Sequence, residues 1–565
     1  MRRSARRLWL PSALLALVYA GLPSVVAKAE DLSPGGEPHR VHALVGGTVV
    51  PRPGERIEGG VVVIRDGRVE AVGADVAVPP DALRWDLRGR VVYPGLIEPY
   101  LRLDPPSPPA SEAPPRPSPS ARTLPPGGAR HENPAVRADR RAAAELRLDA
   151  KTRAALREAG FTAALVAPAR GIFRGSSVLV TLGEGPLRER VLRAEVAEHL
   201  AFESKGSGYP NSLMGAMALA RQTLLDAERQ RAALAAYARN PLGVPRPEHD
   251  LALAALAPVL SKERPVCFEA PDAQTALRAA RLLAEFRLTP WLVLGSGDAW
   301  RWLDELAALG APLVTTLNLP PAPRWEDPSE EPDVETDALR AWRLARREPS
   351  LLSARGLRFS FTCAGLNDRK TWRARVRELL AAGLDEDEAL AALTTAPAAM
   401  LGSPPLGVIA PGVAANFTVC DGPLFAKETR LVETWIDGRR YLPPPRLPTP
   451  EDLAGRWTLR CEGADTEESS FLLAVEEGAL CARLAKGTPP LRPAPALRRD
   501  RLEVVLPAGR LAPSATARVV LRLDGRRALG RWSAGGRSGA VFATFAPASP
   551  EGRDAPAPDA PAPDA

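Results

Sequence analysis

Apolar and polar residues alternate along residues 42–92 with the two-residue period of β-strands. Two such runs, Val61 to Arg65 and Arg68 to Val72, flank the dipeptide Asp66-Gly67. A type I′ turn needs positive φ at both central residues, and Asp followed by Gly meets that need. The segment therefore predicts a β-hairpin, and Asp437-Gly438 predicts a second one in the same way.

The pattern changes between residues 146 and 402, where helical periodicity alternates with short, continuous apolar runs. A helix predicted over Trp300 to Leu309 stops at Gly310, and the apolar run Pro312 to Leu317 follows. Near-continuous apolar strands separated by helices are typical of a parallel sheet covered by helices. At about 300 residues, the α/β pattern predicts a closed (β/α)8 TIM-like barrel. We assign it to residues 93–402.

After residue 402 the chain returns to β-patterns. Residues 453–547 read as a separate all-β module, a small sandwich or an up-and-down barrel, in which Gly455-Arg456-Trp457 is echoed by Gly530-Arg531-Trp532. Proline is dense in residues 105–134, which predicts an exposed, disordered insertion. The Pro/Ala/Asp repeat of residues 551–565 carries no folding signal.

The first 29 residues have the pattern of a secretory signal peptide. Four arginines precede an apolar run from Leu8 to Leu22, and Ala27-Lys28-Ala29 is a small-x-small cleavage site. An uncleaved anchor is the alternative, and no later stretch is apolar enough to span a membrane. We expect a secreted, periplasmic or cell-envelope protein.

Charge and cysteine content narrow the functional classes. The formal net charge of +7 falls to +2 without the leader, because the leader holds four Arg and one Lys and no acid. A nearly neutral chain argues against a nucleic-acid or anionic-membrane footprint. Among the five cysteines, Cys461 and Cys481 lie in neighbouring predicted strands and either pair or remain small buried residues.

Three stretches carry a resemblance to the amidohydrolase superfamily, in its secreted imidazolonepropionase-like branch. They are Gly59–Gly73, Leu87–Ile97 and Leu406–Phe417. The resemblance covers residues 42–442. It implies a composite β-sandwich, built from residues 30–92 and 403–442, that flanks a metal-dependent barrel.

The resemblance also implies where metal ligands should stand. A His-x-His pair falls on Tyr100 and Arg102, the fifth-strand histidine on Glu269, the sixth-strand ligand near Ser296, and the last aspartate on Ala364. Arginine has no lone pair for a metal. None of the five histidines stands at a matched position. We therefore expect no metal cofactor, with zinc in a rebuilt site as the alternative.

Five residues are candidates for the barrel mouth: Glu98, Tyr100, Arg102, Glu269 and Asp298. A buried charge needs a partner, so Arg102 should pair with Glu98 or Glu269. The two glutamates could instead act as general acid and base, although an ion-pair network is the favoured interpretation.

A second set of candidates lies in the Gly-bounded segment from Gly171 to Ser177, interpreted as a loop at the ligand-binding end of the barrel. Arg174 and Ser176 are its candidate ligand-binding residues, with Arg174 holding an anionic group. Cys267 and Cys363 are predicted near strand ends, where a buried inert thiol is favoured over a nucleophile.

Two functional classes follow. The first is an exported, metal-free pseudoenzyme that serves as a binding or scaffolding module, with a small-molecule or peptide ligand in the barrel mouth. The second is an active hydrolase of C–N bonds that uses a rebuilt site. Because fold persists when function changes, the resemblance alone does not establish activity. The sequence does not indicate an oligomeric state.

Overall fold

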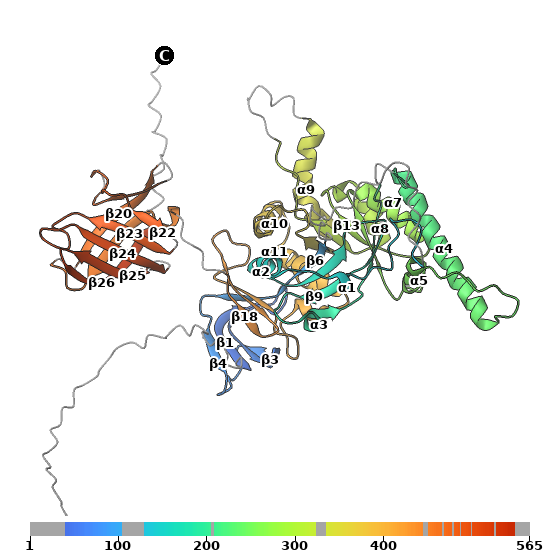
Figure 1. The fold of residues 1–565 in the computed structure, drawn as a ribbon, viewed down its shortest axis with the longest axis horizontal. Helices are drawn as coiled ribbons and strands as arrows, with labels where there is room; N and C mark the ends of the chain where they lie inside the picture. The colour runs from blue at the N-terminus through green and yellow to red at the C-terminus, as the bar shows by residue number, and fades with distance from the viewer. Residues whose placement is uncertain are drawn as a thin grey trace, which may run out of the picture. The chain divides into compact units, whose positions relative to one another are not determined.

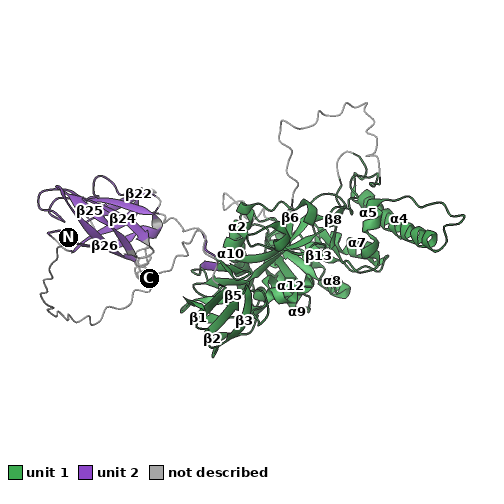
Figure 2. Ribbon diagram, turned by 60° about the horizontal axis from the view of Figure 1, so that its bottom comes forward, with its two compact units in different colours: residues 1–430, 434–440 green, residues 431–433, 441–565 purple. Residues whose placement is uncertain are grey.

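The computed structural model describes ten stretches of the chain. They are residues 40–103, 129–204, 208–323, 335–443, 450–465, 468–476, 479–485, 488–498, 500–524 and 527–547. The predicted signal peptide, most of the Pro-rich insertion and the C-terminal repeat fall outside these residues. The chain divides into two compact units, one comprising residues 1–430 and 434–440 and the other residues 431–433 and 441–565 (Figure 2). Each unit is described by itself.

Strands from both flanks of the α/β region form one eight-stranded sheet. Their order is β18-β17-β16-β5-β1-β2-β3, with β4 paired to β1. The strands are β1 Val41–Val49, β2 Ile57–Arg65, β3 Arg68–Gly73, β4 Leu83–Asp86, β5 Val91–Pro94, β16 Phe417–Cys420, β17 Leu431–Ile436 and β18 Arg439–Tyr441. The antiparallel pairing of β5 with β16 joins the two flanks, which lie more than 300 residues apart.

Both predicted hairpin turns have the expected backbone. Asp66 and Gly67 have φ of 49° and 78°, and Asp437 and Gly438 have φ of 51° and 75°. This confirms the type I′ prediction for each turn. The two turns also lie against each other, because a Cβ on Gly67 would stand 2.7 Å from the backbone oxygen of Asp437.

Seven parallel strands form the α/β region, which Figure 1 shows surrounded by helices. They are β6 Leu96–Leu103, β7 Phe161–Pro168, β11 Glu198–Ala201, β12 Val266–Ala270, β13 Trp291–Leu294, β14 Leu313–Thr316 and β15 Phe359–Thr362. They belong to two sheets, ordered β10-β9-β7-β6 and β15-β14-β13-β12-β11-β8. Apolar side chains from five of these strands share one interior core, including Ile97, Leu165 and Val293. We call this body the barrel.

Three short strands depart from the expected parallel pattern. β8 Phe173–Ser176, β9 Val178–Thr181 and β10 Val191–Arg193 are all antiparallel to a neighbour. The interpretation of residues 171–177 as a loop was therefore wrong. Residues 173–176 form a fully buried strand because their backbone bonds with β11 and their side chains pack inside.

Helices follow most of the barrel strands. They are α1 Ala142–Glu145, α2 Ala150–Glu158, α3 Leu187–Arg190, α4 Leu213–Arg239, α5 Leu251–Ala255, α6 Ala257–Leu260, α7 Ala273–Ala284, α8 Leu303–Leu309, α9 Thr336–Ala354, α10 Trp372–Ala381, α11 Glu386–Leu393 and α12 Thr395–Met400. Short 3-10 turns cover η2 Ala299–Arg301, η4 Arg369–Thr371 and η5 Pro404–Gly407.

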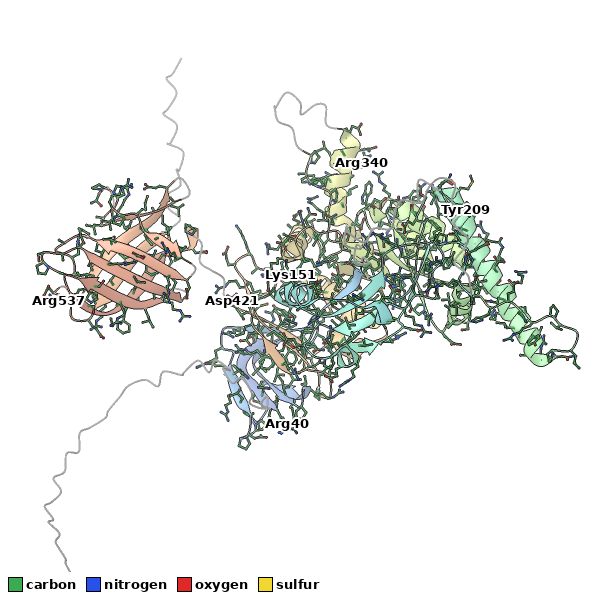
Figure 3. All side chains as sticks on the ribbon, in the orientation of Figure 1. Arg40, Lys151, Tyr209, Arg340, Asp421 and Arg537 are labelled. Carbon is green, nitrogen blue, oxygen red and sulfur yellow. The ribbon has the colours of Figure 1, made fainter. Side chains whose placement is uncertain are left out.

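Two of these helices are notable for how they end or begin. The end of α8 at Gly310 is confirmed, with φ of 60° at that glycine. α4 begins at Leu213, four residues after Tyr209, whose side chain is labelled in Figure 3.

Across the described residues, no helix combines the length and apolarity needed to cross a bilayer.

The C-terminal module is a nearly closed antiparallel β-barrel. Its order is β21-β20-β19-β26-β25-β24-β23-β22. The strands are β19 Gly455–Cys461, β20 Glu468–Glu476, β21 Ala479–Arg483, β22 Ala496–Arg498, β23 Arg501–Leu506, β24 Ala517–Asp524, β25 Arg527–Ala534 and β26 Arg537–Pro547, preceded by the turn η6 Glu451–Leu453. Both Gly-Arg-Trp motifs place their tryptophan, Trp457 or Trp532, in the core.

The sequence indicated that Cys461 and Cys481 lie on neighbouring strands, and this prediction was wrong. β20 separates β19 from β21, and both thiols are free. Cys461 packs in the core, which agrees with the alternative of a small buried residue.

A candidate ion-pair site at the barrel mouth

The site begins at the carboxyl end of β6, where an irregularity in the strand sets the direction of each side chain. The register with β7 shifts between Glu98 and Leu101, so β6 carries one extra residue there. Pro99 lies in this bulge, where its missing N–H costs no ladder bond. Tyr100 consequently points into the interior core, and Arg102 emerges at the rim with 47% of its side chain exposed.

Glu269 on β12 is the centre of the cluster. Its Oε1 accepts a hydrogen bond from Nη1 of Arg102 at 3.0 Å. Its Oε2 accepts from the hydroxyl of Tyr100 and from Nη1 of Arg174, the latter at 2.5 Å. The expected pairing of Arg102 with a glutamate is therefore confirmed, with Glu269 as its partner.

Arg174 reaches the same carboxylate from β8, and only 6% of its side chain is exposed. Its Nε donates to the oxygen of Gly171 at 3.1 Å, and its Nη2 lies 4.0 Å from Glu203. The adjacent Gly175 has φ of 103°, and a Cβ there would meet the oxygen of Arg140 at 2.3 Å. Glycine at this position thus lets β8 approach the preceding segment and bring Arg174 inward.

The charges in this cluster stabilise one protonation state. Burial alone would raise the pKa of Glu269, but the charge of Arg174 and hydrogen bonds from Tyr100 and Arg174 hold that pKa below its usual value. Burial and the nearby Glu269 charge raise the pKa of Tyr100 well above its ordinary range. Near neutral pH, the site therefore holds a carboxylate, a phenol and two guanidinium ions.

Glu98 is turned away from this cluster and is fully buried. Its Oε1 accepts from the hydroxyl of Thr362 at 2.5 Å and from the Tyr100 N–H at 3.1 Å. Its Oε2 accepts from the Cys363 N–H at 2.9 Å. Burial raises its pKa despite these bonds. Glu98 therefore links β6 to β15, in a structural position.

His199 on β11 joins the site from a position that sequence reasoning did not select. Its ring stacks on Tyr100 with centroids 5.8 Å apart. Its Nε2 is buried and has no hydrogen-bond partner in the structure as described. Burial, with the charge of Arg174, lowers its pKa to about 3, so the ring is neutral. No motif or spacing in the sequence singles out His199.

The other candidate residues lie elsewhere. Asp298 accepts from the Ala273 N–H at 2.9 Å and from the Ser296 hydroxyl at 2.5 Å, so it caps the start of α7. Ser176 is buried on β8, and its hydroxyl has no partner among the described residues. Burial raises the pKa of the Cys363 thiol well above its usual value, as expected for an inert thiol. Cys267 is likewise buried.

The residues present do not fit a divalent metal. Tyr100, Arg102 and Glu269 do converge where the resemblance places ligands, but a guanidinium cannot coordinate a metal and repels one. Ser296 bonds to Asp298, and Ala364 has no side-chain donor. Within the described part of the chain, no group of three or more His, Cys, Asp or Glu residues could hold a metal ion.

Comparison with known proteins places the fold. An amidohydrolase from Thermotoga maritima MSB8 superposes with a TM-score of 0.57 at 19% identity, over 71% of this chain and all of that one. A putative prolidase from Bifidobacterium longum has 16% identity and a TM-score of 0.40, over 72% of this chain and 96% of that one. No family model and no curated protein matches the sequence. The chain therefore has the amidohydrolase superfamily fold, with an additional C-terminal β-barrel module.

Proposed function

We propose that this protein is a catalytically degenerate member of the amidohydrolase superfamily whose barrel mouth is a metal-free binding site. The observation that carries the proposal is the pairing of Glu269 with Arg102, Arg174 and Tyr100. These bonds engage both carboxylate oxygens at the fifth-strand ligand position. The positive charge that a metal ion would supply comes instead from two guanidinium ions of the chain itself.

The same geometry disfavours metal-free hydrolysis. A general base needs a free lone pair and a pKa near the working pH. Glu269 lacks a suitable pKa, because that pKa is lowered, and three hydrogen bonds already engage its two oxygens. Glu98 has both oxygens bonded inside the barrel, and the Cys363 thiol has a raised pKa. None of these three side chains is thus prepared to activate water, and the pKa of His199, lowered to about 3, makes its ring a weak base.

The retained barrel would instead hold a small molecule or a peptide. Arg102 is half-exposed at the rim and its guanidinium has donors beyond those used by Glu269. A ligand carboxylate is the group that suits such a fork. The leader pattern supports export, so we place this binding function outside the cytoplasm, in a (β/α)8-type barrel flanked by a composite β-sandwich.

Elemental analysis of purified residues 30–565 tests the metal-free part of the proposal. We expect far less than one equivalent of zinc, manganese or iron, and no hydrolysis of dipeptide, lactam or ester panels. Stoichiometric metal that disappears in Glu269→Ala would overturn the proposal in favour of a hydrolase with a rebuilt zinc site. The specific observation behind that alternative is the unpartnered Nε2 of His199 beside Glu269.

Binding is tested by thermal shift against dipeptides and small carboxylates. We expect at least one compound to raise the melting temperature, and we expect Arg102→Ala to abolish that shift. Arg188→Ala is the matched control, because Arg188 is an exposed arginine of the same unit that pairs only with its neighbour Glu189. A shift that survives in Arg102→Ala would place the ligand elsewhere.

A further inference from the structure

The C-terminal module is strongly polarised in charge, although the formal net charge of residues 30–565 is only +2. Residues 450–497 carry five Arg and Lys against eight Asp and Glu. Residues 498–537 carry ten Arg against three Asp and Glu. This basic segment contains β23 to β25, which are consecutive in the sheet. The module therefore has one basic face, which the net charge of the chain does not reveal.

The ladder register shows how the arginines are arranged on that face. Arg501 of β23 is the partner of Arg522 on β24, which is the partner of Leu529 on β25. One row further along, Val520 of β24 is the partner of Arg531 on β25. Side chains on paired residues of an antiparallel sheet point to the same side, about 5 Å apart. On β23 the same row holds Glu503, which pairs with Val520. Guanidinium groups therefore lie around two apolar side chains, with the Glu503 carboxylate beside Val520.

A hollow of about 630 Å³ lies at this position. Its lining includes Arg501, Arg518, Arg522, Arg531, Val520 and Leu529. Leu529 is 60% exposed although it is a large apolar side chain. The hollow is open to solvent rather than enclosed, so a small molecule bound there would contact the sheet with one side.

The four arginines differ in how they are already engaged. Arg518 pairs with Glu503 at 2.6 Å, and Arg522 pairs with Asp500 at 2.9 Å. Arg501 and Arg531 form no salt bridge among the described residues of the module, although the charge of Arg501 helps to lower the pKa of Asp500. Two guanidinium forks are therefore available at one hollow, each with the planar geometry that binds a carboxylate, phosphate or sulfonate in bidentate fashion.

We propose that the hollow on β23–β25 binds a small amphiphilic anion, which is an acidic head group attached to an apolar body. Arg501 and Arg531 would hold the head group, and Val520 and Leu529 would contact the body. The apolar floor favours such a ligand over a purely polar anion. The hollow favours a small molecule over the flat surface of a membrane. This site is independent of the barrel mouth and of the function proposed for it.

The test uses the full mature chain and the fluorescent probe 8-anilinonaphthalene-1-sulfonate, an aromatic body with one anionic group. We expect saturable binding at one equivalent, weakened about tenfold or more in Arg501→Ala/Arg531→Ala, as loss of charge-assisted bonds implies. The matched control is Arg456→Ala/Arg460→Ala, which removes two exposed arginines of β19 in the same module. It should leave the affinity unchanged.

A matched ligand separates charge from apolar contact. N-phenyl-1-naphthylamine has the same aromatic body without the sulfonate, so it should bind more weakly and respond little to the arginine substitutions. Leu529→Ser should weaken both probes. A variant that keeps the charge, Arg501→Lys/Arg531→Lys, guards against misfolding and should retain part of the affinity, since lysine lacks the bidentate fork.

Three results would overturn the proposal. One is equal affinity for the sulfonate probe in the wild type and the double alanine variant. Another is probe binding that is lost in Arg102→Ala, which would assign it to the barrel mouth. The third is arginine-dependent binding of phosphatidylglycerol vesicles, or of a peptide with the sequence of residues 551–565, without competition from the probe.

Discussion

The ion pair of Arg174 and Glu269 allows a quantitative test of the barrel-mouth geometry. Only 6% of the Arg174 side chain and 23% of the Glu269 side chain are exposed. Removing one member of a buried pair costs about 3–5 kcal/mol, because the other charge is left without compensation. In Arg174→Met, Arg102 still pairs with Glu269 at 3.0 Å, and a half-exposed pair contributes at most about 1 kcal/mol. We therefore expect a loss of about 3 kcal/mol.

A double-mutant cycle isolates the pair. Arg174→Met and Glu269→Gln should each destabilise the barrel, while the double variant should cost about 2 kcal/mol less than their sum. Because a chain with two compact units need not unfold in a single transition, hydrogen exchange of peptides that span β12 should be followed along a urea series. The exposed pair Arg221–Glu285, with 43% and 46% of its side chains exposed, is the control and should couple by less than about 1 kcal/mol.

The coupling should also depend on pH in one direction. The pKa of Glu269 is lowered in the folded state, so its stabilising contribution is present above the ordinary glutamate pKa of about 4.3. It is lost as the pH falls through the folded-state value. A coupling below about 0.5 kcal/mol at pH 7, where the carboxylate is fully charged, would refute the reasoning.

Three further outcomes follow from the buried side chains of Glu348 and His199 and from the close backbone contact of Gly530. Burial raises the pKa of Glu348 to about 8, so the wild type should lose thermal stability as the pH rises from about 4 to about 8. The variant Glu348→Gln should not show this loss. Burial lowers the pKa of His199 to about 3, so wild-type stability should fall below about pH 6.5, and His199→Leu should remove that acid dependence in the same melting series. A Cβ on Gly530 would stand 1.9 Å from the oxygen of Val520, so Gly530→Ala should destabilise the C-terminal module by more than about 3 kcal/mol. Hydrogen exchange of β25 peptides should then accelerate while β12 peptides stay protected.

Local patterns accounted for much of the fold. The turn at Asp66-Gly67 was predictable because its φ values depend on two adjacent residues, and the end of α8 at Gly310 depends on one. The buried strand β13 was predictable because its apolar run is continuous. Each of these features is decided within a few residues of the chain.

The candidate site was only partly predictable. The side chains of Tyr100, Arg102 and Glu269 could be placed together because parallel strands end at one edge of a barrel. The contact of Arg174 with Glu269 could not be predicted from the sequence, because β8 runs antiparallel to β11 and no local pattern encodes that pairing. The bulge after Glu98 could not be predicted either. Glu98 was expected at the barrel mouth, but it bonds to the end of β15 instead.

The sequence by itself determined most of the strands, helices and turns, although not β8, and it determined that arginine and tyrosine stand where metal ligands would be expected. Those properties depend on side-chain chemistry and on short-range periodicity. Only the tertiary structure decided which charges meet. It placed Arg174 on Glu269 across 95 positions of chain, and it gathered the basic rows of β23–β25 around one hollow. Such contacts depend on the register and direction of strands distant in sequence, which neighbouring residues do not specify.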